Sequence, residues 1–207
     1  MTRIFLARHG ESIGTFERRM ESRTSSPLTS NGIEEVKLLA SRLKEEKFHA
    51  IYTSPSLRAV QTAEIIIGDR DMTLIKKEDL YEMDIGSWDG KKLEDIARTD
   101  RNQLTQFLEH PELFSPEEGE SFYDVQNRVI SFLSHIKNDH KNQSILIISH
   151  TVALKLLMCH FKGQTIEDIW EPPEMKNASL SLVHIHNEEV SIELYADDSH
   201  LGNISVI

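Results

Sequence analysis

QSILIIS, residues 143–149, is the most apolar short run of the chain, and the expected fold class follows from it. A strand that is apolar at nearly every position is typical of the centre of a parallel sheet, where helices cover both faces. His150 follows directly, and TVALKLLMCHF (151–161) is apolar and long enough for a buried helix. This stretch predicts a strand–helix unit with a histidine at the turn.

Strand and helix patterns alternate through the rest of the chain. Further strands are expected at 2–7, 49–54 and 72–77, and helices at 30–43, 55–67, 91–97, 102–110 and 122–137. Residues 8–29 and 80–90 have the composition of irregular segments, and 178–186 and 190–196 form a β-hairpin pattern joined by NEE. This order predicts an α/β fold of three layers, α/β/α, with a mainly parallel central sheet and a late antiparallel hairpin. With no linker or internal repeat, residues 1–207 are expected to form a single domain.

Composition narrows the classes of partner. The formal net charge of −11 repels nucleic acids and anionic membranes, so neither is expected as a partner. No apolar run approaches the roughly 20 residues of a membrane span, and MTRIFLARHG turns polar too early for a signal peptide. Cys159 is the only cysteine, which excludes an intramolecular disulfide and a cysteine-based zinc site. A cytoplasmic location is expected, and the sequence predicts no oligomeric state.

Four basic or imidazole side chains fall where strands are expected to end. Arg8 and His9 follow the first strand, Arg58 lies in the first turn of the helix after the second, and His150 follows QSILIIS. Ligands of such sheets collect beyond the carboxyl ends of the strands. Guanidinium groups match phosphate oxygens, a neutral imidazole can attack phosphorus, and a second histidine can stabilise the charge that develops. The pattern indicates phosphoryl chemistry.

An acid is also needed, because an alkoxide leaves poorly unless it is protonated. The loop DLYEMDIGSWDG (79–90) offers Glu82 and Asp84. The residues alone do not decide between these two carboxyl groups.

Six motifs in order resemble the histidine phosphatase superfamily, also called the phosphoglycerate mutase-like family. They are LARHGES (6–12), SPLTSNG (26–32), IYTSPSLRAVQTAE (51–64), LYEMDIGSWDG (80–90), GES (119–121) and ILIISHT (145–151). The resemblance extends over nearly the whole chain, and ERRM (17–20), DIWEPP (168–173) and the late hairpin are most similar to the bacterial broad-specificity phosphatases. It implies hydrolysis of a phosphomonoester, with a small phosphorylated metabolite as substrate and with no metal or other cofactor.

The resemblance also implies a role for each matching residue. His9 becomes the phosphohistidine, Arg8 and Arg58 bind the phosphoryl group, and His150 is the second pocket histidine. Glu82 is the proton donor, since it holds the family's acidic position in LYEMDIG. The residues expected to contact the substrate are Arg8, Thr15, Glu21, Ser22, Arg58, His150 and Thr151.

Several positions depart from the family pattern. Thr15 stands where an asparagine is frequent, Glu21 replaces a glutamine, Ser22 a glycine and Ser25 an aspartate, and Thr151 follows His150 in place of glycine. A Glu21 carboxylate opposes an incoming phosphate unless it is protonated or is paired with Arg18, Arg19 or Arg23. These changes bear on substrate identity and rate more than on the type of reaction.

Two alternatives remain open. One is a mutase that returns the phosphoryl group to another hydroxyl of a bound sugar acid. The segment after GSWDG has Lys91, Lys92, Arg98 and Arg101, and it lacks the adjacent arginine pair of the phosphoglycerate mutases. The other is a binding protein that kept the pocket and lost turnover. Trp88 and Trp170 could line a leaving-group pocket, and core packing is the competing interpretation for both.

Overall fold

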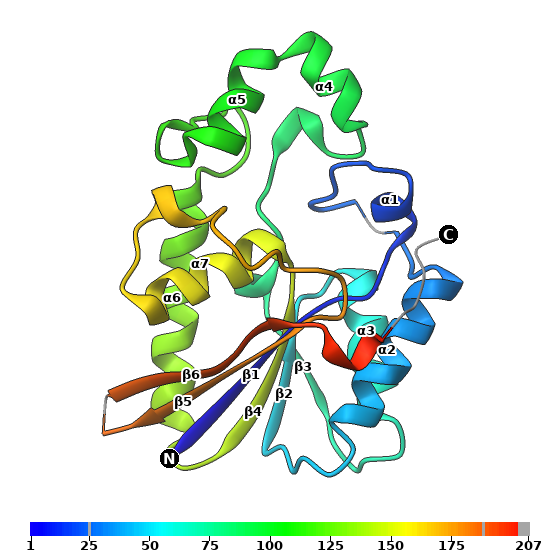
Figure 1. The fold of residues 1–207 in the computed structure, drawn as a ribbon, viewed down its shortest axis with the longest axis vertical. Helices are drawn as coiled ribbons and strands as arrows, with labels where there is room; N and C mark the ends of the chain where they lie inside the picture. Colours follow the sequence, from blue (N-terminus) through cyan, green and yellow to red (C-terminus); the bar gives the residue numbers. More distant parts are fainter. Residues whose placement is uncertain (25, 188, 203–207) are drawn as a thin grey trace.

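The computed structural model describes residues 1–24, 26–187 and 189–202, so Ser25 and the middle residue of the NEE turn, Glu188, lie outside the described residues. A six-stranded sheet with the order β3-β2-β4-β1-β5-β6 forms the centre of the described part (Figure 1). Its strands are β1 (Thr2–Arg8), β2 (Ala50–Thr53), β3 (Leu74–Lys76), β4 (Ser144–Ser149), β5 (Leu180–His186) and β6 (Glu189–Asp197).

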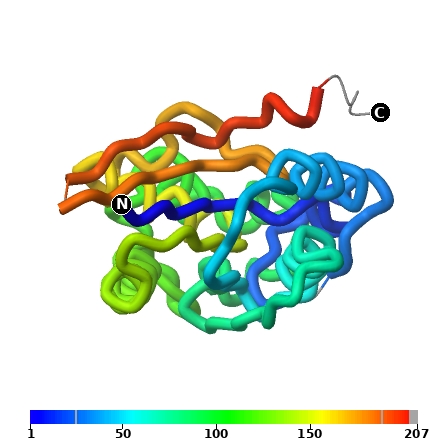
Figure 2. Tube along the Cα trace, turned by 90° about the horizontal axis from the view of Figure 1, so that it is seen from below, coloured from blue at the N-terminus to red at the C-terminus, as the bar shows by residue number. Residues whose placement is uncertain are grey.

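The predicted topology is confirmed. β4 runs parallel to both β1 and β2, and β3 runs parallel to β2. β5 pairs antiparallel with β1 and with β6, so the late hairpin extends one edge of the sheet. In Figure 2 the orange and red hairpin lies beside the blue β1. The apolar QSILIIS run therefore lies in the interior of the sheet, as its composition predicts.

Helices cover both faces of the sheet. α2 (Ser30–Arg42) and α3 (Leu57–Ile67) cover one face, and α6 (Phe122–Asp139) and α7 (Thr151–Lys162) cover the other. The shorter helices α1 (Ile13–Phe16), α4 (Leu93–Thr99) and α5 (Arg101–Glu109) lie beyond one end of the strands (Figure 1). Short 3₁₀ turns lie at Glu78–Leu80, Gly86–Trp88, Pro111–Leu113, Ile166–Asp168 and Ser199–Leu201. None of the described helices is both long and apolar enough to cross a membrane.

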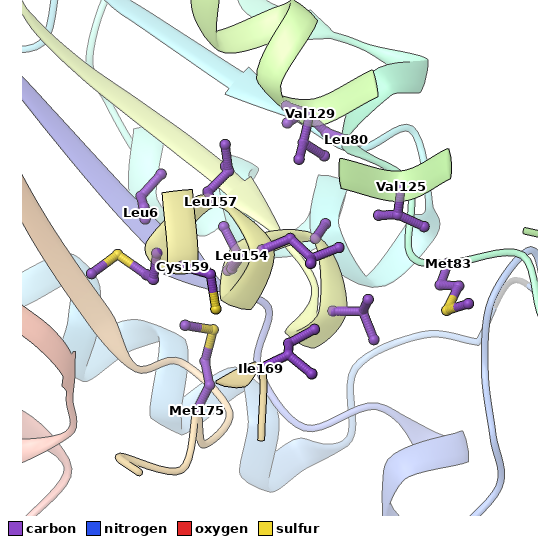
Figure 3. Packing of buried hydrophobic residues seen from close by; sticks show 14 of the residues in the cluster. Leu6, Leu80, Met83, Val125, Val129, Leu154, Leu157, Cys159, Ile169 and Met175 are labelled. Atoms are coloured by element: carbon purple, nitrogen blue, oxygen red, sulfur yellow. The ribbon is translucent and has the colours of Figure 1, made fainter. Parts of the chain in front are cut away.

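Alternate residues of each central strand belong to different cores. In β1, Ile4 and Leu6 pack with α6 and α7, whereas Phe5 and Ala7 pack with α2 and α3. This follows from the period of two in a strand, and it gives the three predicted layers. Figure 3 shows the first core around α7, where Leu154, Leu157 and Cys159 lie among Leu6, Ile169 and Met175.

One segment expected to be irregular contains a short helix. Residues 13–16 form α1, because Ser12 accepts a hydrogen bond from the Thr15 N–H and caps the turn. A four-residue helix has no apolar period of its own. Helix α2 is capped in the same way by Thr29, whose side chain accepts from the Gly32 N–H.

Candidate active site

The carboxyl ends of β1 and β4 and the start of α3 meet at one cavity. Because β1, β2 and β4 are parallel, the segments that follow them leave the same edge of the sheet. Lining residues come from these segments, from the loops at 15–21 and 82–85, and from two later aromatic positions. They are Arg8, His9, Thr15, Arg19, Met20, Glu21, Arg58, Glu82, Met83, Ile85, Phe107, Thr151, Val152 and Trp170.

His9 is fixed in the tautomer that a nucleophile needs. It is 4% exposed, and its Nδ1 lies 2.7 Å from the Gly10 carbonyl oxygen, to which only an Nδ1–H can donate. The lone pair is then on Nε2, which accepts from Arg58 Nε at 3.3 Å. Burial, followed by the charges of Arg58 and Arg8, holds the pKa of His9 well below 6.5, so the ring is neutral at pH 7.

Arg58 connects His9 to the loop at residues 21–24. It is 1% exposed, and its two terminal nitrogens donate to the carbonyl oxygens of Glu21, Ser22 and Thr24. Burial lowers the pKa of Arg58, although the nearby Glu21, Glu82 and Asp89 oppose this shift. Bidentate hydrogen bonding of Arg58 to a phosphate would therefore compete with its hydrogen bonds to these carbonyl oxygens.

Arg8 and His150 each keep one buried nitrogen without a partner among the described residues. For Arg8 it is Nε, while Nη1 donates to the Met175 carbonyl at 2.7 Å. For His150 it is Nδ1, while Nε2 lies 2.9 Å from Ser54 Oγ and 3.2 Å from Ser56 Oγ. If either of these two serine hydroxyls donates to Nε2, the proton of the His150 ring is on Nδ1 and is available to a ligand.

The two histidine rings lie close together, with centroids 5.0 Å apart. Burial, then Arg58 and His9, holds the pKa of His150 well below 6.5. The unpaired nitrogens of Arg8 and His150 are the kind of donors that a bound anion would satisfy.

Glu82 lies at the amino end of α7. Its Oε2 accepts from the Val152 N–H at 3.3 Å and its Oε1 from the Met83 N–H at 2.9 Å. Arg128 of α6 holds the preceding backbone, donating to the carbonyls of Asp79, Tyr81 and Glu82. Asp84, the other candidate acid, accepts from the Gly86 N–H and does not line the cavity.

The residues expected to contact the substrate are not all in equivalent positions. Thr15, Glu21 and Thr151 line the cavity. Ser22 is fully buried and its side chain is not part of the lining, and it contributes its backbone carbonyl to Arg58. Among the described residues, Glu21 forms no ion pair with Arg18, Arg19 or Arg23.

One side of the cavity is apolar. It is formed by Met20, Met83, Ile85, Phe107 and Trp170. Trp170 therefore lines the cavity, and its indole N–H donates to the Phe107 carbonyl at 2.7 Å. Trp88 packs in the core against Phe107 and Phe114, as its competing interpretation predicts.

Sequence reasoning missed the supports around the site. Ser54 and Ser56 orient His150, and Arg128 orients the Glu82 loop. The sequence does contain a signal for Ser54 and Ser56, because they belong to the polar run TSPS (53–56) between the end of a strand and Arg58. Arg128 had none, because nothing in an amphipathic helix pattern distinguishes an arginine that faces a distant loop from one that faces solvent. Within the described ranges no three His, Cys, Asp or Glu residues are placed to hold a metal ion.

Comparison with known proteins gives consistent similarities. Residues 4–198 match the family described as "Histidine phosphatase superfamily (branch 1)". Phosphoserine phosphatase 1 of Hydrogenobacter thermophilus is 30% identical over 100% of this chain and 97% of its own. The solved structure of Bacillus stearothermophilus YhfR is 36% identical with a TM-score of 0.94, over 97% of this chain and 100% of that one. A probable phosphoglycerate mutase, GpmB of Escherichia coli, is 26% identical over 97% of this chain and 95% of its own.

Proposed function

Since this chain belongs to the histidine phosphatase superfamily (branch 1), we propose that it hydrolyses phosphomonoesters in two steps through a phosphohistidine on His9. Its family and relatives show that the chain is a phosphatase. The phosphohistidine intermediate and the roles of the individual residues are proposed. The observation that carries the proposal is the His9 ring, whose Nε2 lone pair accepts from Arg58 in a cavity that Arg8 and Glu82 also line, with the centroid of the His150 ring 5.0 Å from that of His9.

The first step forms a phosphorus–nitrogen bond. His9 Nε2 attacks phosphorus while the bond from phosphorus to the ester oxygen breaks, and the Glu82 carboxyl gives its proton to that oxygen. The neutral state of His9 supports this role, since a protonated ring has no lone pair. Arg8 Nε and His150 Nδ1 supply donors for the phosphoryl oxygens as charge spreads over them.

The second step releases phosphate. Water attacks phosphorus, Glu82 takes the water proton, and the phosphorus–nitrogen bond breaks. The electron pair of that bond returns to Nε2 as the lone pair, while the Gly10 carbonyl retains its hydrogen bond from Nδ1–H. Glu82 regains its proton, and the free enzyme is restored.

Replacement of the nucleophile tests this mechanism. His9→Ala is expected to abolish turnover of an aryl phosphate, because no other group takes the phosphoryl group. His135→Ala, which removes an exposed histidine of α6, is the matched control and should retain the wild-type rate. Near-normal hydrolysis by His9→Ala would contradict the mechanism.

A mutase activity is the second candidate, supported by the similarity to GpmB. Both activities share the phosphohistidine, and they differ in whether the monophosphorylated product is retained. Exchange of isotope between 2- and 3-phosphoglycerate would indicate a mutase, whereas release of inorganic phosphate without exchange would support the hydrolase.

The proposed substrate is a small phosphorylated metabolite whose leaving group contacts the apolar side of the cavity. The similarity to a phosphoserine phosphatase makes phosphoserine a first compound to assay. A cytoplasmic location is also proposed, since a single buried cysteine suits a reducing compartment. Phosphate release across a panel of metabolites, compared by kcat/KM, tests the substrate class.

A further inference from the structure

Asp89 binds the backbone of a loop that is distant from it in the sequence. One of its carboxylate oxygens accepts from the Ser22 N–H and the other from the Thr24 N–H, each at 2.8 Å. Residues 21–24 belong to no helix or strand, so this carboxylate supplies the acceptors that secondary structure does not. Burial would raise the pKa of Asp89, but the hydrogen bonds from Ser22 and Thr24 lower it, and the group is ionised at pH 7.

The carbonyl groups of the same loop bind Arg58. Its Nη2 donates to the Glu21 and Ser22 carbonyl oxygens at 3.3 Å, and its Nη1 donates to that of Thr24 at 3.0 Å. The Glu21 carbonyl and the Ser22 N–H belong to one peptide group. This peptide group therefore lies between the Asp89 carboxylate and the Arg58 guanidinium, with its N–H toward the negative charge and its C=O toward the positive charge. Hydrogen bonds in such a chain polarise and strengthen one another.

The carbonyl contacts determine which way the Arg58 guanidinium faces. They use its two terminal nitrogens, and the Nε–H is left to face His9 Nε2 at 3.3 Å. A long arginine side chain has many rotamers, so contacts of this kind are needed to hold it in one of them. A donor that is already fixed beside the attacking atom can stabilise the charge that develops on a phosphoryl oxygen without reorganisation during the reaction.

We propose that Asp89 is a positioning residue for the reaction: it holds the loop at residues 21–24 so that the loop carbonyls direct the Arg58 Nε–H toward the nucleophile. The inference rests on the proposed function, which assigns Arg58 to the phosphoryl oxygens. Asp89 does not line the cavity, so it acts through Arg58 and not on the substrate. Loss of Asp89 should therefore weaken the interaction with the phosphoryl group and leave protonation of the leaving group unchanged.

Asp89→Asn tests this proposal. Asparagine has nearly the same shape but only one side-chain oxygen, so one of the two loop N–H groups loses its acceptor and faces an NH₂ group. We expect kcat/KM to fall about tenfold or more, and by the same factor for an alkyl phosphate and for p-nitrophenyl phosphate, because the two substrates share the phosphoryl group. The inhibition constant of inorganic phosphate should rise as well. A purely structural role would lower the free energy of unfolding and leave these kinetic constants of the folded protein unchanged.

A double substitution tests whether Asp89 acts through Arg58. In an Arg58→Lys background there is no planar fork to orient, so adding Asp89→Asn should reduce kcat/KM for p-nitrophenyl phosphate much less than it does in the wild type. Asp95→Asn is the matched control, since it makes the same change at an exposed carboxylate of α4, and it should retain the wild-type constants. Asp89→Glu, which moves the carboxylate by one methylene, is the second variant if Asp89→Asn does not fold. It should give the same pattern with smaller losses.

Two outcomes would contradict this inference alone, provided that the wild type hydrolyses p-nitrophenyl phosphate and His9→Ala does not. The first is a folded Asp89 variant with wild-type kcat/KM and wild-type inhibition by phosphate. The second is a loss that is as large in the Arg58→Lys background as in the wild type, since Asp89 would then act on another group. A wild-type protein that hydrolyses neither substrate would contradict the proposed function together with the inference.

Discussion

At the scale of single residues, the account depends on Glu82 as the source of the leaving-group proton. Its two oxygens accept from the N–H groups of Met83 and Val152, which fixes the carboxyl at the start of α7. A fixed acid matters most for substrates whose leaving oxygen is strongly basic, because these cannot depart unprotonated.

Glu82→Gln is therefore expected to affect substrates unequally. Hydrolysis of an alkyl phosphate should fall by about 10²- to 10⁴-fold, and that of p-nitrophenyl phosphate much less, since nitrophenolate leaves without a proton. The measurement is kcat/KM for both substrates. Glu78→Gln, which changes an exposed carboxyl in the 3₁₀ turn before Glu82, is the control. Equal losses for the two substrates would rule out proton donation by Glu82.

At the scale of elements, α6 positions the loop that carries Glu82. Arg128 donates to the backbone carbonyls of Asp79, Tyr81 and Glu82 and also to both carboxylate oxygens of Glu120. Burial alone would raise the pKa of Glu120, but the hydrogen bonds from Arg128 and the Asp84 N–H lower it. These contacts lead us to propose that Arg128 affects the reaction by positioning Glu82.

Arg128→Lys, like Glu82→Gln, should lower the hydrolysis of an alkyl phosphate more than that of p-nitrophenyl phosphate. A lysine is a point charge and cannot keep the forked contacts, each of which contributes about 0.5–1.5 kcal/mol. We expect alkyl phosphate turnover to fall about tenfold or more, with a smaller loss for p-nitrophenyl phosphate. Lys137→Arg, in the last turn of the same helix, is the control. A purely structural role would lower the unfolding free energy and leave the ratio of the two rates unchanged.

Most elements could be predicted because each carries its own local signal. The apolar run of β4 and the shorter apolar run of β1 are properties of neighbouring residues. The short α1 was missed because it depends on one side-chain cap, and a helix of its length carries no period. The meeting of His9, Arg58 and His150 was predictable because parallel strands deliver their ends to one edge.

The contacts within the site could not be predicted in the same way. Arg58 uses its terminal nitrogens on the Glu21, Ser22 and Thr24 carbonyls, which only the folded loop brings near. The burial of Ser22 away from the cavity, and the lack of an arginine partner for Glu21 among the described residues, likewise depend on tertiary geometry.

At the scale of the whole molecule, the active site costs stability at acid pH. His9 and His150 are buried as neutral rings, with pKa values well below the 6.5 of an exposed histidine. Below pH 6.5 the unfolded chain therefore binds protons that the folded chain does not. The free energy of unfolding is fully retained above that pH and falls as pH decreases toward the folded pKa values.

His150→Asn should make this dependence shallower. Each buried neutral histidine contributes a slope of up to about 1.4 kcal/mol per pH unit below pH 6.5. Urea unfolding of wild type and variant at several pH values gives the comparison, and carboxyl groups common to both cancel in the difference. We also propose that residues 1–207 form one domain, so a single transition is expected. Parallel pH profiles for the two proteins would exclude the buried neutral ring as a cause.

Direct detection of the covalent intermediate tests the central proposal. The protein is mixed rapidly with substrate carrying a labelled phosphoryl group, quenched in alkali to preserve phosphohistidine, and digested for mass spectrometry. The label should appear on His9 before phosphate is released in the steady state, and it should be absent from His9→Ala. Phosphate release at the full rate with no label on His9, or with the label on another residue, would contradict the account.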